Sequence, residues 1–194
     1  MNAIMNAPIN IGTSDKLESL FAHADTTIAR DLKLNLTRLL EQGALARDEA
    51  ALALLAAARA VEDQGLERLA REALTAFDLS PDQIEEAAQS AAIMAMLNTY
   101  YRFRHMIAKN DDYRTTGLRM TSLAKPVLGK ERFEMLAFAV SVINGCESCI
   151  KAHEKVLRDT GVSGEKIHDL ARMAAVVRGI KTLRSNLSAV STNK

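Results

Sequence analysis

Hydrophobic residues recur at helical spacing along almost the whole chain, and residues that break helices are sparse after about residue 14. The segment DLKLNL (31–36) alternates between polar and apolar residues, so by itself it also fits a strand. Residues 47–77 are rich in Ala and Leu, which predicts two helices that meet near Gly65. Five leucines mark an amphipathic helix before them: Leu32, Leu34, Leu36, Leu39 and Leu40.

A clear start signal opens the next helix, which we expect within residues 79–108. Ser80 is a good N-cap, Pro81 suits the first helical position, and Gln83 completes a capping box. The apolar positions that follow keep helical spacing: Ile84, Ala87, Ala88, Ala91 and Ala92.

Residues 110–129 contain two glycines, Pro126 and paired aspartates, and we expect a long connection there. Three further helices are predicted after it. They are separated by Asn144-Gly145 and by Thr160-Gly161, where Gly161 suits a left-handed cap. Their expected ranges are about 130–143, 146–159 and 163–186.

The pattern predicts an all-α protein with one helical domain at residues 16–194, after a flexible N-terminal tail at residues 1–15. We expect two halves, at about 16–109 and 130–190, joined by residues 110–129.

The two halves share a weak internal similarity. When residues 79–97 are aligned with residues 162–180, five of nineteen positions are identical. In the same register the positions of Cys146, Cys149, His153 and Glu134 correspond to residues that cannot do thiol chemistry, namely Asp63, Leu66, Ala70 and Ala51. A duplicated helical unit would therefore carry its chemistry in the second copy alone.

Composition supports tightly packed helices, because 48% of the residues are hydrophobic while only 4% are aromatic and Trp is absent. The net charge of +1 gives no reason to expect nucleic acid, and the basic-aromatic cluster at residues 100–105 fits a solvated face or a subunit contact. Neither a signal peptide nor an apolar run of about 18 residues is visible, so we expect a cytoplasmic protein that does not enter membranes.

The candidate chemistry lies in NGCESCIKAHE (144–154), which holds both cysteines of the chain. If a helix starts near Cys146, then Cys149 and His153 project from the same face, and His153 is the i+4 neighbour of Cys149. Unpaired N–H groups and the helix dipole stabilise a thiolate in a first turn. The spacing also allows a disulfide, so the pattern suits thiol redox chemistry.

The cysteine pair is also compatible with different roles, which stay open at this point. A zinc site needs four ligands, and the chain has one Cys pair with no second pair at a recognisable spacing. Covalent haem needs C-x-x-C-H, but Ile150 follows the second cysteine. A thioredoxin-like fold would place the pair after a strand, which the long alanine-rich segment before it does not suit. Two inert buried cysteines are the simplest alternative.

Glu134 lies in the preceding helix among apolar neighbours. Such a residue usually marks the solvent face of an amphipathic helix. If Asn144-Gly145 folds this helix back on the next one, however, Glu134 reaches the cysteines and can accept a proton from a thiol, directly or through His153 or water. Spacing leaves both possibilities open.

Residues 133–162 resemble the signature of the AhpD alkylhydroperoxidases of the carboxymuconolactone decarboxylase-like superfamily. Their pattern is a Glu, eleven residues, and then C-x-x-C-x-x-x-H, which is met here by Glu134, Cys146, Cys149 and His153. The similarity extends to residues 31–36, 91–104 and 117–120. It implies an AhpD-like all-helical fold with a duplicated helical unit, assembled as a homotrimer.

The resemblance also implies roles. Cys149 would be oxidised to a sulfenic acid, Cys146 would donate a proton and then form the Cys146–Cys149 disulfide, and Glu134 with His153 would relay protons. The dipole argument favours Cys146 as the more acidic thiol, because it lies nearer the helix start. Some relatives carry a second His between the cysteines, where this chain has Ser148.

The function implied is reduction of alkyl hydroperoxides, reduction of the disulfide of the peroxiredoxin AhpC, or both, with no bound cofactor or metal. Electrons would come from dihydrolipoamide carried by the lipoyl-bearing acyltransferase of a 2-oxo-acid dehydrogenase complex. The alternative is a redox sensor or binding module on the same fold that does not turn over. Decarboxylation is disfavoured, because members of the superfamily that act on lactones generally lack the C-x-x-C pair.

Overall fold

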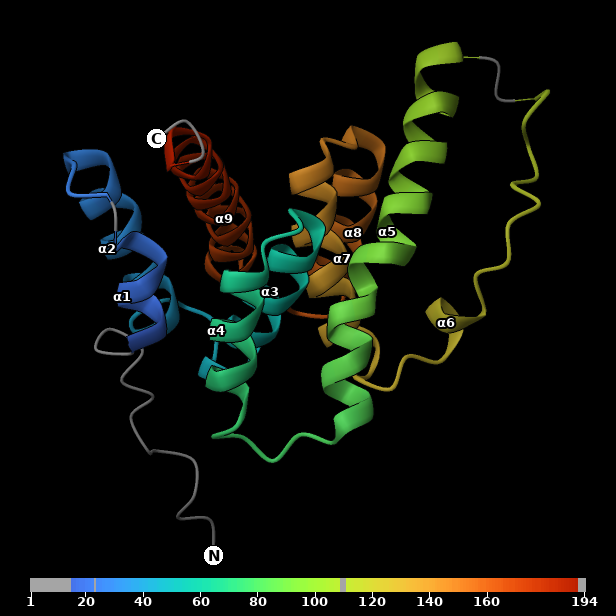
Figure 1. Ribbon diagram of the computed structural model, residues 1–194. Coiled ribbons are helices and arrows are strands. Elements are labelled where there is room, and N and C mark those ends of the chain that lie inside the picture. Colours follow the sequence, from blue (N-terminus) through green and yellow to red (C-terminus); the bar gives the residue numbers. More distant parts are fainter. Residues whose placement is uncertain (1–14, 23, 109–110, 192–194) are drawn as a thin grey trace, which may run out of the picture.

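The computed structural model describes residues 15–22, 24–108 and 111–191, so the tail predicted for residues 1–15 lies outside the described residues except for Asp15. In these ranges every regular element is a helix, which confirms the all-α class (Figure 1). None of the described helices combines the length and hydrophobicity needed to cross a membrane. The helices are α1 (Asp15–Phe21), α2 (Thr27–Glu41), α3 (Arg47–Ala60), α4 (Gln64–Leu74), α5 (Pro81–Ile107), α6 (Thr121–Ala124), α7 (Lys130–Asn144), α8 (Glu147–Asp159) and α9 (Gly164–Ser191).

The internal duplication is visible in the helix boundaries. α3, α4 and α5 begin at positions 47, 64 and 81, and α7, α8 and α9 begin at positions 130, 147 and 164. The three pairs of starts are separated by one constant offset, which is also the offset that aligns position 79 with position 162. The unit is therefore a central helix, a shorter second helix and a long third helix. α1 and α2 precede the first unit, and the connection that contains α6 separates the two units.

The two central helices, α3 and α7, pack against each other at the centre of a core to which the other long helices contribute. Residues 50–58 of α3 and 135–141 of α7 are buried without interruption. A helix that is buried on all sides must be apolar on all sides, and the run ALALLAAA in α3 meets this need with small side chains that allow close packing.

The long third helix of each unit also packs against the other unit. α5 packs on α3 of its own unit and on α7 and α8 of the second unit, while α9 packs on α7 and α8 and also on α3 and α2. Figure 1 shows α5 running beside α7 and α8 along much of its length. This exchange places α5 against the junction between α7 and α8, where the cysteines lie.

Local signals explain most helix ends. The side-chain oxygen of Ser80 accepts a hydrogen bond from the N–H of Gln83, and the Gln83 side chain accepts one from the N–H of Ser80, so the predicted capping box opens α5. The ambiguous segment DLKLNL is helical and lies inside α2, with Thr26 as its N-cap. Four buried residues on one face of α2 resolve the ambiguity: Ala29, Leu36, Leu39 and Leu40.

The two short junctions, α3–α4 and α7–α8, have the same backbone conformation. Glu62 has φ of 56° and Gly145 has φ of 64°, so both junctions turn through the left-handed region at equivalent positions of the two units. Asp63 and Cys146, the next residue in each unit, are the N-caps of α4 and α8. The cysteine at position 146 thus occupies a place where the first unit has a helix-capping carboxylate.

Candidate active site

The turn before the cysteines is a left-handed helix cap. The N–H of Gly145 bonds to the carbonyl of Val142 at 3.2 Å, and the N–H of Cys146 bonds to the carbonyl of Ser141 at 3.2 Å. These two bonds, with Gly145 in the left-handed conformation, form a Schellman motif. The motif ends α7 and fixes the backbone of Cys146 at the N-cap of α8, as the Asn144-Gly145 break predicted.

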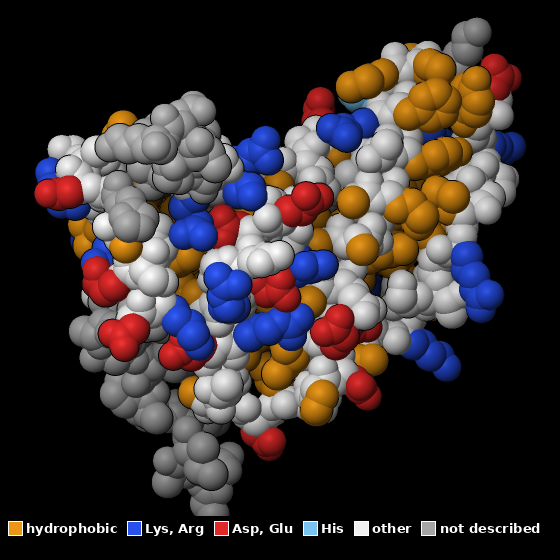
Figure 2. All heavy atoms as spheres, viewed as in Figure 1, with side chains coloured by type: hydrophobic (Ala, Val, Ile, Leu, Met, Phe, Trp, Pro, Cys, Tyr) orange, Lys and Arg blue, Asp and Glu red, His pale blue; other side chains and the backbone are white. Residues whose placement is uncertain are grey.

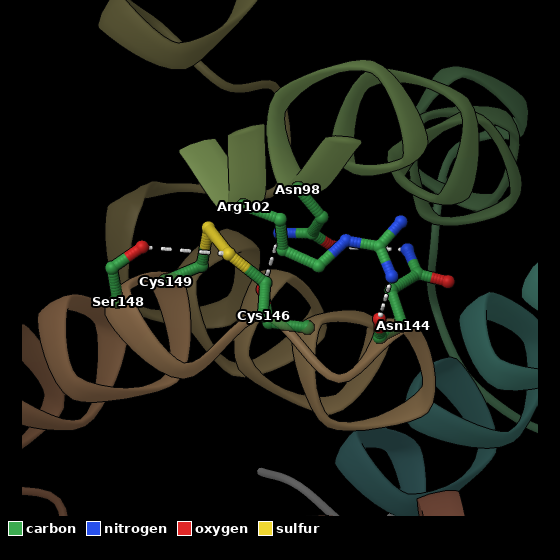
Figure 3. Close-up of a disulfide and its surroundings, with 7 residues drawn as sticks. Asn98, Arg102, Asn144, Cys146, Ser148 and Cys149 are labelled. Atoms are coloured by element: carbon green, nitrogen blue, oxygen red, sulfur yellow. Dashed lines mark hydrogen bonds between the residues drawn. A yellow bond between two sulfur atoms is a disulfide. The ribbon is translucent and has the colours of Figure 1, made fainter. Parts of the chain in front are cut away.

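The structure joins Cys146 and Cys149 in a disulfide (Figure 3). Their Cα atoms are 5.3 Å apart, within the usual range for bridged cysteines. Cys146 is fully buried and Cys149 is 6% exposed, so both sulfurs lie within the protein and Cys149 is the more accessible residue. The hydroxyl oxygen of Ser148 lies 3.6 Å from the sulfur of Cys146.

Glu134 and His153 form the second part of the site. Glu134 is on α7 and His153 is on α8, and their Oε2 and Nδ1 atoms are 2.6 Å apart. Their side chains are only 17% and 15% exposed, so Glu134 faces α8 and does not belong to the solvent face of α7. A carboxylate on one ring nitrogen orients the imidazole, and the other nitrogen can then exchange a proton with a thiol or with water.

His153 lies one helical turn after Cys149, so the imidazole and this sulfur are neighbours on one face of α8. The structure therefore places the four residues singled out in the sequence in two contacting pairs, Cys146–Cys149 and Glu134–His153, that share one helix. This arrangement can carry out thiol–disulfide exchange with an adjacent proton acceptor.

Polar side chains that the sequence did not single out surround the junction. Asn98 of α5 is fully buried and donates a hydrogen bond to the hydroxyl of Ser141 at 3.0 Å, while its amide oxygen accepts one from Asn144 at 2.9 Å. Arg102, one turn later, donates to the carbonyl of Asn144 at 2.9 Å. The sequence signals only Asn98, because this polar residue stands at a position where the helical spacing of α5 predicts an apolar one.

The first turn of α8 also carries an exposed charged residue, Glu147, next to the cysteines. Glu147 pairs with Lys151 one turn later and lies 3.7 Å from His105 of α5. The hydrogen bond and charge of Lys151, followed by the charge of His105, lower the pKa of Glu147. Among the described residues, no three His, Cys, Asp or Glu side chains are grouped in a way that could hold a metal ion.

The chain is similar to known proteins over most of its length. The model of the carboxymuconolactone decarboxylase family matches residues 113–191, which include all four site residues. The chain is 42% identical over 151 residues to alkyl hydroperoxide reductase AhpD of Anaeromyxobacter dehalogenans strain 2CP-C, covering 77% of this chain and 80% of the relative. The chain belongs to the AhpD family.

Two further relatives carry the same name. AhpD of Rhizorhabdus wittichii is 39% identical over 167 residues, covering 85% of this chain and 95% of the relative. AhpD of Mycobacteroides abscessus is 35% identical over 162 residues, covering 84% and 92%. The similarity to AhpD proteins thus extends over both helical units and is not confined to the cysteine motif.

In this AhpD-family chain the first unit uses the equivalent position differently. Asp63, at the position equivalent to Cys146, caps α4 by accepting a hydrogen bond from the N–H of Leu66 at 3.0 Å, and it bonds to Arg184 at 3.0 Å. Burial alone would raise the pKa of Asp63, but these two bonds and the charge of Arg184 hold the pKa below its ordinary value. The position therefore holds a helix-capping carboxylate in one unit and a disulfide-bonded cysteine in the other.

Proposed function

We propose that the protein is a dithiol peroxidase that reduces alkyl hydroperoxides through a Cys146–Cys149 disulfide cycle. The observation that carries the proposal is the buried disulfide at the start of α8 beside the Glu134–His153 pair. The AhpD relatives, which are named alkyl hydroperoxide reductases, support the same class of substrate.

In the proposed cycle, the thiolate of Cys149 attacks the terminal oxygen of the hydroperoxide and the O–O bond breaks. The leaving alkoxide takes a proton from the thiol of Cys146 and departs as an alcohol, and Cys149 becomes a sulfenic acid. The thiolate of Cys146 then attacks the sulfur of Cys149 and the S–O bond breaks. The hydroxide takes a proton from the Glu134–His153 pair and leaves as water while the disulfide forms. Two electrons and two protons from a dithiol restore both thiols.

Two features support Cys149 as the first nucleophile. Cys149 is 6% exposed, while Cys146 has no exposed surface, so a substrate reaches Cys149 more readily. His153 is the i+4 neighbour of Cys149 and is held by Glu134, which gives this thiol a nearby proton acceptor. The helix dipole taken alone favours a thiolate on Cys146, at the N-cap, but that cysteine is fully buried where a substrate does not reach it, which suits it to act as the resolving thiol.

We propose dihydrolipoamide as the electron donor, carried by the lipoyl-bearing acyltransferase of a 2-oxo-acid dehydrogenase complex, and AhpC as a second disulfide substrate. Support for both comes from the family membership. A lipoyl group is a flexible dithiol, so it can present both of its sulfurs to a largely buried disulfide one after the other. The cytoplasmic location stays a prediction.

We also propose the homotrimer. Figure 2 shows hydrophobic side chains gathered over the C-terminal part of α5, in the upper right of the view. Three residues of this part are exposed and apolar: Phe103, Met106 and Ile107, with Met106 79% exposed. Nearer the start of α5, a groove of about 690 Å³ is lined by Ile93, Met96, Val127 and Phe133 among others. Apolar surface of this extent supports contact with another subunit.

The deciding experiment measures steady-state consumption of cumene hydroperoxide with dihydrolipoamide, reduced thioredoxin or glutathione as the sole reductant. We expect many turnovers, fastest with dihydrolipoamide, and none in a Cys149→Ser variant. Undiminished turnover in that variant would overturn the proposal. Formation of one disulfide per chain, without further turnover under any reductant, would identify a redox sensor.

A further inference from the structure

α5 holds the turn in front of the cysteines through a buried amide. The side chain of Asn98 bonds to two residues of the last turn of α7, because it donates to the hydroxyl of Ser141 and accepts from the amide of Asn144. The carbonyl of Ser141 in turn accepts the N–H of Cys146. Asn98 is therefore connected to the backbone of the first cysteine through a single residue.

Arg102 adds a second contact from the same helix. Its Nη1 atom donates to the carbonyl of Asn144, two residues before Cys146. Figure 3 shows Asn98 and Arg102 projecting from α5 toward the α7–α8 junction, on the side where the disulfide lies. The two side chains thus hold the last turn of α7, at Ser141 and at Asn144, directly before the junction.

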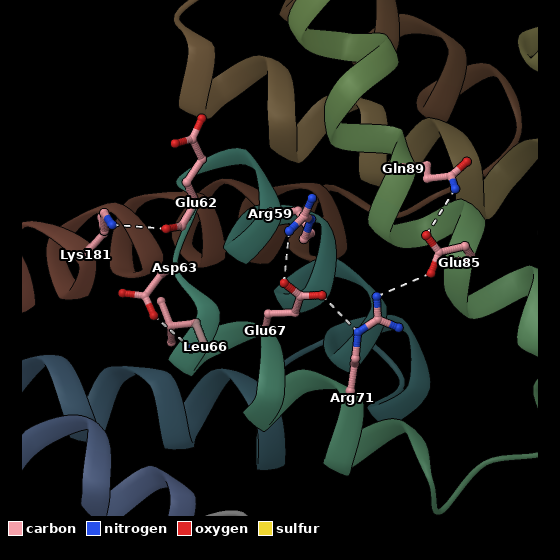
Figure 4. Close-up of polar contacts among 9 residues, drawn as sticks. All are labelled: Arg59, Glu62, Asp63, Leu66, Glu67, Arg71, Glu85, Gln89 and Lys181. Atoms are coloured by element: carbon pink, nitrogen blue, oxygen red, sulfur yellow. Dashed lines mark hydrogen bonds and ion pairs between the residues drawn. The ribbon is translucent and has the colours of Figure 1, made fainter.

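The first unit provides an internal comparison. Lys181 of α9 is the counterpart of Asn98 in the duplicated unit, and it also contacts the junction of the opposite unit. Its Nζ atom donates to the carbonyl of Glu62 at 3.1 Å (Figure 4). The fold thus uses its third helices to hold both junctions. The junction that carries the cysteines is held by a fully buried amide with bonds to two side chains, whereas Lys181 donates to a backbone carbonyl.

We propose that Asn98, assisted by Arg102, is a positioning residue that keeps the two thiols at disulfide distance when the protein is reduced. The inference rests on the proposed function only in assuming that the pair cycles between disulfide and dithiol. In the oxidised protein the S–S bond itself holds Cys146. In the reduced protein that restraint is absent, and the contacts with α5 keep Cys146 at the N-cap.

The consequence for the redox equilibrium has a defined direction. Loosening the junction gives Cys146 more conformational freedom in the dithiol state than in the disulfide state. The dithiol then gains entropy, and the equilibrium of the protein disulfide with dihydrolipoamide shifts toward protein dithiol and oxidised lipoamide. Formation of the disulfide from the sulfenic acid slows for the same reason, because the effective concentration of one thiol at the other falls.

The test is the equilibrium constant of this exchange, measured by alkylation of thiols and mass spectrometry in lipoamide–dihydrolipoamide buffers. We expect Asn98→Ala to shift the constant toward the protein dithiol by about 5- to 10-fold, the ratio that corresponds to the loss of a net hydrogen bond. Arg102→Met should shift it in the same direction by a smaller factor, and Arg102→Lys should restore most of the wild-type value.

Two control variants separate this role from a general loss of stability. Ser90→Ala removes a buried hydroxyl from the same helix, where Ser90 bonds within its own turn to the carbonyl of Ala87. Lys181→Met removes the contact at the junction that has no cysteines. Both should lower or maintain the unfolding temperature without changing the equilibrium constant.

The proposal would be overturned if the equilibrium constant is unchanged in both Asn98→Ala and Arg102→Met. It would also be overturned if Lys181→Met shifts the constant as much as Asn98→Ala does. If Asn98→Ala does not fold, the pair Arg102→Met and Arg102→Lys decides the question. The measurement needs no hydroperoxide, so an inactive wild-type protein would contradict the proposed function and leave this test intact.

Discussion

The Nδ1 atom of His153 lies 2.6 Å from Oε2 of Glu134, and the two side chains join α8 to α7 beside the cysteine pair. Both are less than one-fifth exposed, so water screens their interaction weakly. A partly buried carboxylate–imidazole pair of this kind can move a proton without a change in backbone position. Removing the charge of the carboxylate should therefore affect turnover more than folding.

Replacing Glu134 by Gln should reduce peroxidase turnover while leaving the fold intact. Gln keeps a hydrogen-bonding group near His153 but removes the charge that stabilises the imidazolium, so proton transfer becomes less favourable. We expect kcat to fall by about 10²-fold, within the range for loss of a general acid or base. The matched control is Glu154→Gln, which removes a carboxylate that pairs with Arg158 on the same helix; equal losses in both variants would contradict the relay.

The two cysteines should differ when each is replaced by Ser. In Cys146→Ser, Cys149 still has His153 as its neighbour, and we expect one equivalent of hydroperoxide to be consumed per chain, with the sulfenic acid trapped by dimedone on Cys149. In Cys149→Ser, the fully buried Cys146 should give no dimedone adduct at the same peroxide concentration. Mass spectrometry reads both results, and a reversed pattern would make Cys146 the attacking thiol.

The apolar face of α5 should be required for assembly. Met106→Asp places a charge at a residue that is 79% exposed in the single chain, where it disturbs no internal packing. If this face is a subunit contact, the charge must be buried there, and light scattering after gel filtration should show the mass of a monomer. Ile28→Asp on α2 is the control, because Ile28 is also apolar and 66% exposed. A trimer in both variants, or a monomer in wild type, would contradict this assignment of the interface.

Much of the fold was readable in the sequence because local signals agree with tertiary structure. The capping box at Ser80 opens α5, and the Asn144-Gly145 break ends α7 within one residue of the expected position. The offset between the halves, found from a weak match of alanine-rich segments, equals the spacing of three pairs of helix starts. The short helices α1 and α6 were missed, since seven and four residues are too few for a clear hydrophobic period.

The site was only partly readable. Cys146, Cys149 and His153 lie close together in the sequence, so helical spacing alone places them on one face. Glu134 is on a different helix, and its direction depends on how α7 folds back on α8, which no local pattern specifies. Asn98 and Arg102 contact residues that are distant in the sequence, and only the packing of α5 across the second unit brings them to the junction.

The left-handed positions of the two junctions should respond in opposite directions to substitution. Gly145 has φ of 64° and no described atom near the place of an added Cβ, so Gly145→Ala should cost about 1 kcal/mol of unfolding free energy from backbone strain alone. Glu62 already bears this strain at φ of 56°, with an exposed side chain. Glu62→Gly should therefore maintain stability or raise it by less than about 1 kcal/mol, because the unfolded chain gains freedom as well. Urea unfolding measures both, and a large loss in Glu62→Gly would show that its side chain stabilises the junction.

Asp63 should make the stability of the protein depend on acid pH. Burial opposes its charge, but the N–H of Leu66 and the guanidinium of Arg184 hold its folded pKa below the unfolded value, which is about 3.9. A depressed folded pKa means that the carboxylate contributes its stability fully above the unfolded pKa and loses it as pH falls through the folded pKa. Asn is also a good N-cap, so Asp63→Asn removes the charge and keeps the cap.

We therefore expect Asp63→Asn to lower the unfolding free energy by about 1–2 kcal/mol at pH 7, as for loss of a charge-assisted hydrogen bond. The difference from wild type should shrink as pH falls below about 4. Asp25→Asn is the control, because the side chain of Asp25 pairs with Arg30 but is 95% exposed. This variant should change the unfolding free energy by less than about 0.5 kcal/mol at any pH. Urea unfolding from pH 7 down to the acid transition measures both variants. A difference for Asp63→Asn that stays constant through the acid range would mean that packing of the side chain, and not its charge, stabilises the α3–α4 junction.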